Sequence, residues 1–476
     1  MDYYVTIHIL YLQERKYVTM ETSKDQKMST MPIPQLMISL AIPSVIAQII
    51  NVLYNIVDRI YIGHMADVGD IALTGVGVTF PIIMLISAFS YFVGSGGAPL
   101  ASIQLGKQNK EKAEQILSNG TMLLICFSII LTIFFFIFKT PLLYSFGASD
   151  QTIGYANDYL NIYLIGTIFV QLALGLNPFI SSQGQAKTAM LSVLIGAVTN
   201  IVLDPIFIFV FGMGVKGAAL STILSQALSA LWVIRFLTSN KSVIRIKKSY
   251  MKPQLPILMS IGALGISPFI MQSTESLINI VLNRSLQIYG GDLYVGSMTI
   301  IQSVMQLIVV PIQGFTQGVQ PIISYNFGAG KFDRVKTTFK YTLIITFTLT
   351  TICCILTTQF PEVFASLFTN KKELLDIVVK VMPIFMSGIF MFGLQMGCQT
   401  AFMGLGQAKI SLFLALLRKV ILLVPLAIVL PLIFGTVTSI YYSEPISDII
   451  SALTACLIFL FTRKKILSPE ALQKIK

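Results

Sequence analysis

The stretch Leu123-Leu-Ile-Cys-Phe-Ser-Ile-Ile-Leu-Thr-Ile-Phe-Phe-Phe-Ile-Phe138 carries no charged residue and does not alternate between polar and apolar side chains. A strand of a membrane β-barrel would alternate in this way. A helix needs about 20 mostly apolar residues to cross a bilayer core about 30 Å thick. We therefore interpret residues 114–138 as a membrane-spanning helix.

The whole chain has the composition of a membrane protein. Of its 476 residues, 55% are hydrophobic and 11% are charged, whereas a soluble domain carries about 25% charged residues. This excludes a soluble multidomain enzyme, a disordered chain and a collagen-like chain. Twelve stretches are long and apolar enough to span a bilayer: 36–62, 72–104, 114–138, 156–180, 188–211, 216–238, 255–286, 292–323, 338–358, 377–403, 409–434 and 440–461. We predict an all-α membrane protein with twelve transmembrane helices.

The chain has a net charge of +12, and the positions of its basic residues predict its orientation in the membrane. In a soluble protein this excess would suggest nucleic acid, but here the basic residues gather in the loops that follow even-numbered spans. These are Lys107, Lys110, Lys112, Lys187, Lys241, Arg245, Lys247, Lys248, Lys252, Lys331, Arg334, Lys336 and Lys409. Because basic loops stay in the cytoplasm, we expect a multi-pass protein of the cell membrane with both termini cytoplasmic and no nucleic-acid partner.

An internal repeat defines the architecture. Gly184-Gln-Ala-Lys187 recurs 222 positions later as Gly406-Gln-Ala-Lys409, and Gly106 recurs as Gly328. Ser225, Ser229 and Ala230 match Ser447, Ser451 and Ala452 at the same spacing; Gln48, Asn51 and Asn55 match Gln272, Glu275 and Asn279 at a spacing of 224. Each half holds six spans, so the two bundles have the same orientation, as in transporters with parallel repeats.

The repeat divides the chain into five parts: an N-terminal tail (1–35), a six-helix bundle (36–238), a basic linker (239–254), a second six-helix bundle (255–462) and a basic tail (463–476). The segment Tyr3–Leu12 is too short and polar for a cleavable signal. We interpret the first 30 or so residues as an overlong gene start, with Met20 or Met28 as the true start, or as a mobile tail.

Acidic residues inside the spans are the candidates for function, because each costs about 2.5–3.5 kcal/mol to insert. Asp58 ends a polar stripe on the first span, and Asn200 and Asp204 are neighbours one turn apart on the fifth. By depth, both acids and Thr222 lie in the same half of the membrane. We predict that Asp58, Asn200, Asp204 and Thr222 form one pocket that takes a proton, or Na⁺ through the oxygens of Asp58, Asn200 and Asp204. The alternative is structural hydrogen bonding, with Asp58 paired to Arg59.

Weaker polar features line other spans. Asn55, Glu275, Asn279 and Gln306 are candidates for a substrate site or a secondary cation site, with interhelical hydrogen bonding as the alternative. We expect Arg284, Arg418, Glu444 and Asp448 to form structural ion pairs.

Motifs of soluble enzymes are absent. The five cysteines lie in apolar stretches and the two histidines cannot build a metal site with them. Gly212-x-Gly214-x-x-Gly217 joins two spans with no strand before it, and Gly328-Ala-Gly330-Lys331 is not a nucleotide-binding loop. We therefore expect no enzyme and no cofactor, and an ion gradient as the energy source.

Four segments resemble the multidrug and toxic compound extrusion (MATE) family over about residues 36–462. They are Asn55-Ile-Val-Asp-Arg-Ile-Tyr-Ile-Gly63, Asn200-Ile-Val-Leu-Asp-Pro205, Gly212-Met-Gly-Val-Lys-Gly-Ala-Ala-Leu-Ser-Thr222 and Gln320-Pro-Ile-Ile-Ser-Tyr-Asn-Phe-Gly-Ala329. The resemblance implies export of cationic, amphipathic compounds in exchange for H⁺ or Na⁺. It assigns Asp58, Asn200, Asp204 and Thr222 to the cation-coupling cluster of prokaryotic members.

In another branch of that family, an acid matching Glu275 binds Na⁺ together with an aspartate on the tenth helix. Residues 381–403 contain no acid here, which favours coupling through the N-terminal half. We expect a monomeric secondary antiporter of small organic molecules, working by alternating access in the lipid bilayer. The alternative within transport is a flippase for a lipid-linked precursor, for which Arg59, Arg284 and Arg418 would have to face the cleft.

Overall fold

The computed structural model describes residues 27–65, 68–369 and 371–474. The segment Tyr3–Leu12 and Met20, on which the hypothesis of a late start depends, lie outside the described residues. Met28 is buried, and its carbonyl oxygen accepts hydrogen bonds from Asn326 and Arg334. The described chain contains helices and no strand.

The first half is a bundle of six spans. Its helices are α2 (Ile33–Gly63), α3 (Gly69–Gly106), α4 (Lys110–Ser145), the bent pair α5 (Ile153–Ile165) and α6 (Thr167–Ser181), α7 (Ala186–Pro205) with the π-helical segment η1 (Ile206–Val210), and α8 (Val215–Thr238). A linker containing the short helix η2 (Lys248–Tyr250) leads to the second half.

The second half repeats the order of the first. Its helices are α9 (Leu255–Gly290), α10 (Asp292–Gly328), α11 (Phe332–Gln359), the short α12 (Pro361–Ser366), the bent pair α13 (Lys372–Met386) and α14 (Ile389–Gly404), α15 (Ala408–Leu416) with the π-helical η3 (Leu417–Leu423) and α16 (Val424–Phe434), α17 (Thr438–Tyr441), α18 (Ser443–Ile466) and α19 (Pro469–Lys474). Among the described residues ten helices can cross a membrane by length and composition, or twelve when each bent pair counts as one span. The predicted all-α fold with two repeated bundles is confirmed.

The repeat extends to single contacts. The fourth span bends by 60° at Gly166 and the tenth by 43° at Gly388, 222 positions later. A side chain at Gly166 would collide with Ile223, and one at Gly388 would collide with Pro445, again 222 positions apart. Each bend therefore lies where a span crosses the last membrane-spanning helix of its own half, α8 or α18.

Two hydrogen bonds also correspond between the halves. The Asn177 side-chain amide donates to the carbonyl oxygen of Ala189 at 2.9 Å. The Gln399 amide donates to the carbonyl oxygen of Ser411 at 3.2 Å. Both members of the second pair lie 222 positions after those of the first, so the two bundles share their internal packing as well as their topology.

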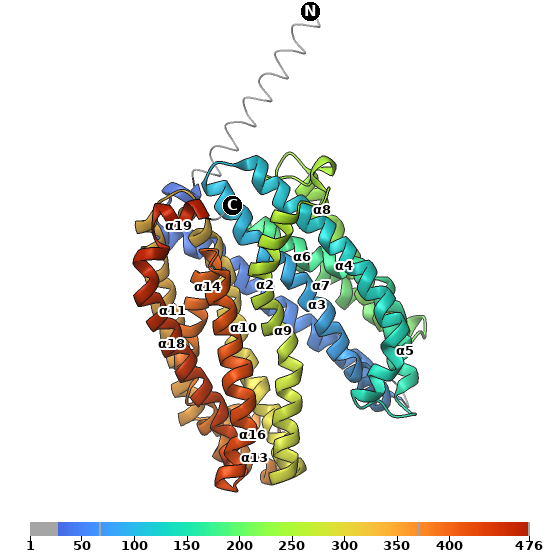
Figure 1. Cartoon of the computed structure of the whole chain (residues 1–476). Helices are drawn as coiled ribbons and strands as arrows, with labels where there is room; N and C mark the ends of the chain where they lie inside the picture. The colour runs from blue at the N-terminus through green and yellow to red at the C-terminus, as the bar shows by residue number, and fades with distance from the viewer. Residues whose placement is uncertain (1–26, 66–67, 370, 475–476) are drawn as a thin grey trace, which may run out of the picture.

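The halves join through close helix crossings. α3 packs on α9, and α10 packs on α2. Gly96 lies against Gly265 in the first crossing and Gly318 lies against Ala41 in the second, because a β-carbon at either glycine would meet backbone atoms. In Figure 1 the two halves meet toward the top and diverge toward the bottom.

Candidate functional site

The intramembrane acids of the first half lie together. α2 and α7 are in contact, which brings Asp58 and Asp204 close enough for their carboxyl groups to interact. Asp204 is fully buried; its Oδ1 accepts a hydrogen bond from the Asn200 amide at 3.2 Å and one from the Ser221 hydroxyl of α8. The carboxyl pair is thus held between three helices.

Thr222 joins this cluster through an aromatic residue. Its hydroxyl donates to the carbonyl oxygen of Ala218 at 2.9 Å and also contacts the hydroxyl of Tyr159 on α5. Tyr159 is 4% exposed and lies within electrostatic range of Asp58 and Asp204. The structure therefore brings together all four residues predicted for this pocket and adds Ser221 and Tyr159 to them.

Three oxygen atoms of this cluster lack a hydrogen-bond donor. Asp58 Oδ1, Asn200 Oδ1 and Asp204 Oδ2 are buried, and no donor reaches them from the described residues. Buried polar atoms nearly always form a hydrogen bond, so three unpartnered oxygens in one cluster need a physical explanation. Oxygen acceptors without donors suit a proton on a carboxyl group or a hard cation such as Na⁺.

The alternative pairing of Asp58 with Arg59 is not the one that the structure favours. The Arg59 guanidinium lies over the ring of Phe80, 5.2 Å from its centroid. No group of three or more His, Cys, Asp or Glu side chains suited to a metal ion occurs in the described part of the chain.

A cavity of about 120 Å³ adjoins the cluster. Asn51 and Tyr54 of α2 line it, and Tyr54 also lies within electrostatic range of Asp58. On the other side, Gln317 and Gln320 of α10 line it, and Gln48 donates to Gln317 at 2.8 Å. Ligand pockets usually measure about 300–1,000 Å³, so in this conformation the cavity is smaller than a usual ligand pocket.

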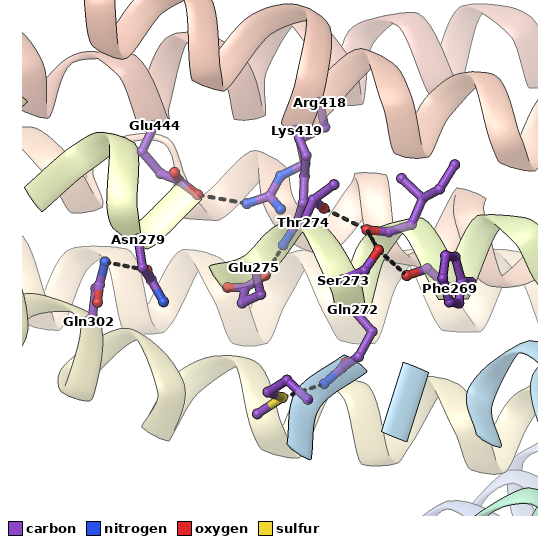
Figure 2. A network of polar contacts seen from close by, with 12 residues as sticks. Phe269, Gln272, Ser273, Thr274, Glu275, Asn279, Gln302, Arg418, Lys419 and Glu444 are labelled. Carbon is purple, nitrogen blue, oxygen red and sulfur yellow. Dashed lines mark hydrogen bonds and ion pairs between the residues drawn. The ribbon is translucent and has the colours of Figure 1, made fainter. Parts of the chain in front are cut away.

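The four residues predicted for a substrate site or a secondary cation site do not lie together. Asn55 donates to the backbone of Asn51 at 2.6 Å, Asn279 accepts from Gln302 at 2.9 Å, and Gln306 is exposed on α10. Glu275 instead belongs to a charged network of the second half, shown in Figure 2.

That network surrounds η3. Arg418 donates to Glu444 and to Asp448, each at 2.7 Å, which confirms the ion pairs expected for these three residues. Arg284 is exposed, and the partner of both Glu444 and Asp448 is Arg418 instead. The partner of Glu275 is Lys419, which sequence reasoning missed. The signal was the basic pair Arg418-Lys419 in the middle of an otherwise apolar span.

Comparisons with known proteins agree with this fold. The model of the MatE family matches residues 43–206 and 268–429, one match in each half. The multidrug export protein MepA of Staphylococcus saprophyticus is 27% identical over 438 residues, covering 91% of this chain and 95% of the relative. MepA of Staphylococcus aureus is 26% identical over 435 residues, covering 91% and 95%.

Solved structures of MATE proteins have a similar fold. A crystal structure of a MATE protein in a bent conformation superposes with a TM-score of 0.84 at 25% identity, covering 95% of this chain and 98% of the other. The straight conformation gives a TM-score of 0.85 at 24% identity, covering 94% and 98%. With the family model matched across both halves, this chain belongs to the MATE family of membrane transporters.

Proposed function

We propose that this protein is a secondary multidrug exporter of the cell membrane, with both termini in the cytoplasm. It exchanges amphipathic organic cations for H⁺ or Na⁺ by alternating access. The three donorless oxygens of Asp58, Asn200 and Asp204, beside a cavity lined by the same helix α2, carry this proposal. The MepA relatives, which are multidrug export proteins, support it.

The coupling follows from electrostatics. Two carboxyl groups in contact cannot both be charged without a large cost away from water. A proton or Na⁺ taken up from outside relieves that cost and draws α2 and α7 together around Asp58 and Asp204. Because Asn51 and Tyr54 of the same α2 line the cavity, this movement reshapes the cavity wall and releases the exported molecule.

The lining of the cavity suits an amphipathic substrate. Its wall contains polar side chains such as Gln48, Asn51 and Gln226 and apolar ones such as Ala47 and Pro99. A positive charge on the substrate gains from nearby carboxylates while they are ionised and loses that gain when the coupling ion neutralises them. Uptake of the ion and release of an organic cation are therefore linked.

Export of cations is favoured over flipping of an anionic lipid precursor. A headgroup site needs free basic residues, and Arg418 is buried and held by Glu444 and Asp448. Arg59 and Arg284 are exposed, but neither lines the cavity beside the carboxyl pair. Transfer of a labelled anionic lipid between leaflets, with no transport of organic cations, would support the flippase instead.

The test uses purified protein in liposomes and efflux of a fluorescent organic cation. We expect an imposed pH gradient or Na⁺ gradient to drive efflux in the wild type, and Asp204→Asn to abolish the gradient-driven part. Asp333→Asn, at an exposed carboxylate on α11, serves as the control and should transport as the wild type does. Gradient-driven efflux that persists in Asp204→Asn would refute the mechanism.

A further inference from the structure

Positions that are equivalent by the repeat carry different types of residue in the two halves. In the first half Asn51, Gly196, Ala197 and Gln226 all line the cavity. The repeat matches them to Glu275, Arg418, Lys419 and Asp448, at spacings of 224 for the first pair and 222 for the others. Neutral residues around a cavity in one half thus correspond to charged residues in the other.

The charged residues of the second half are joined by contacts. Arg418 bridges Glu444 and Asp448 of α18, and all three side chains are less than 10% exposed. Lys419, the next residue, forms an ion pair with Glu275 of α9 and not with α18. Figure 2 shows the Lys419 side chain extending to Glu275 and the Arg418 guanidinium facing Glu444.

Both basic residues lie in the π-helical segment η3. It runs from Leu417 to Leu423 and buries both Arg418 and Lys419. π-helical turns inside α-helices are rare and often occur at functional sites. Here the segment supplies two cations to the interior from consecutive positions.

Glu275 differs from the other acids of the network in its exposure. Its side chain is 54% exposed, whereas that of Lys419 is 9% exposed. An ammonium group held at a partly exposed carboxylate occupies the place that a soluble cation would take. Since Arg418 forms ion pairs with Glu444 and Asp448, the ion-pair partner of Glu275 is Lys419.

We infer that Lys419 is a tethered cation that occupies the acidic site of the second half, so that Glu275 takes no soluble cation while Lys419 is present. The two halves then divide their tasks: the first exchanges an ion at Asp58 and Asp204, and the second keeps its own ion covalently attached. This inference stands apart from the identity of the coupling ion and from the exported substrate.

Removal of the ammonium should turn Glu275 into a site for a monovalent cation. In Lys419→Met the network keeps one cation, Arg418, beside three carboxyl groups. Glu275 is then free to gain a proton or to bind Na⁺ from solution. Lys419→Arg keeps the positive charge and is the matched control.

The experiment labels carboxyl groups of the full-length protein in detergent with dicyclohexylcarbodiimide, which attacks protonated carboxyl groups, and quantifies the label at Glu275 by mass spectrometry. In Lys419→Met we expect about tenfold more label than in the wild type, equivalent to about 1.4 kcal/mol, and a decrease when NaCl replaces choline chloride. In the wild type and Lys419→Arg the label at Glu275 should be low and insensitive to Na⁺. Glu275→Gln in the Lys419→Met background should remove the signal.

Either of two results would overturn the inference: equal labelling of Glu275 in the wild type and Lys419→Met, or labelling of wild-type Glu275 that already falls with Na⁺. If Lys419→Met fails to fold, Lys419→Gln, which keeps a polar side chain, is measured in the same way. Because the readout is specific to Glu275, its outcome is independent of whether Asp204→Asn abolishes efflux.

Discussion

Gly106 and Gly328, 222 positions apart, pack reciprocally across the boundary between the halves. A β-carbon at Gly106 would collide with the carbonyl oxygen of Tyr325, and one at Gly328 would collide with the carbonyl oxygen of Ile103. Ile103 and Tyr325 are themselves 222 positions apart. The ends of α3 and α10 therefore meet backbone to backbone at a pseudo-twofold axis, and closure of the halves depends on the absence of side chains there.

The first prediction concerns this contact. Gly328→Ala places a methyl group against backbone atoms that cannot yield as a flexible side chain would, and overpacking of this kind costs about 1–3 kcal/mol. Alanine otherwise favours a helix by about 1 kcal/mol over glycine. We expect a lower thermal unfolding midpoint in detergent and slower efflux, because the halves no longer close on each other.

Gly77→Ala is the matched control for that substitution. Gly77 also lies within a helix, α3, but no atom lies within 4 Å of its would-be β-carbon. Its unfolding midpoint should stay unchanged or rise slightly. Equal effects of the two substitutions would show that the reciprocal contact does not hold the halves together.

The sequence was sufficient to predict this architecture because membrane spans and repeats are patterns of many residues. The spacing of 222 positions by itself aligns Gly106 with Gly328. It could not reveal the bends at Gly166 and Gly388, because a glycine within an apolar span is compatible with a straight helix. Their cause is the close crossing with α8 or α18, which depends on tertiary packing.

The second prediction treats Asp58 and Asp204 as a unit. If one ion is shared between the two carboxyl groups, either single substitution to asparagine removes the shared site. We expect Asp58→Asn, Asp204→Asn and the double variant to lose gradient-driven efflux to the same extent. Residues that act together are strongly non-additive in this way.

Efflux assays in liposomes under a pH gradient and under a Na⁺ gradient measure this effect for all three variants. Retention of half or more of the wild-type rate in either single variant would mean that each carboxyl group works alone. The same measurements decide which of the two ions the wild type uses.

The candidate site was predictable in part. Asp58, Asn200 and Asp204 stood out because acids and amides are rare and costly within spans. Ser221 and Tyr159 did not, since serine often hydrogen-bonds to its own helix and a tyrosine in an apolar helix is usually packing. The pair formed by Lys419 and Glu275 was missed because a lysine beside Arg418 in a long apolar stretch does not indicate by itself which acid it reaches.

The third prediction concerns the linker on the surface of the first half. Lys247 forms an ion pair with Glu114 at 2.5 Å, and Glu114 also accepts from the backbone of Arg245 at 3.3 Å. The hydrogen bond to Glu114 raises the pKa of Lys247 above its ordinary value of 10.5. A raised pKa stabilises the folded state below the ordinary value, and this contribution is lost as pH rises through the folded pKa.

Glu114→Gln should therefore lower the unfolding midpoint at neutral pH by a small amount, because Lys247 is half exposed and screened by solvent. The difference from the wild type should remain constant up to about pH 10 and shrink above it. Thermal unfolding across this range measures it, with Asp333→Asn as an exposed control. A difference that grows with increasing pH would contradict this assignment of the ion pair.

The fourth prediction transfers the tethered cation from one half to the other. Ala197 lines the cavity of the first half at the position equivalent to Lys419 and is 3% exposed. Ala197→Lys would place an ammonium group beside the face of α2 that carries Asn51 and Asp58, where it would compete with the coupling ion and with a cationic substrate. Ala197→Met has a side chain of similar length without the charge. We expect both variants to reduce efflux through the lost volume, and only Ala197→Lys to abolish its dependence on the imposed ion gradient. Equal gradient dependence in the two variants would show that a fixed charge at this position does not replace the exchanged ion.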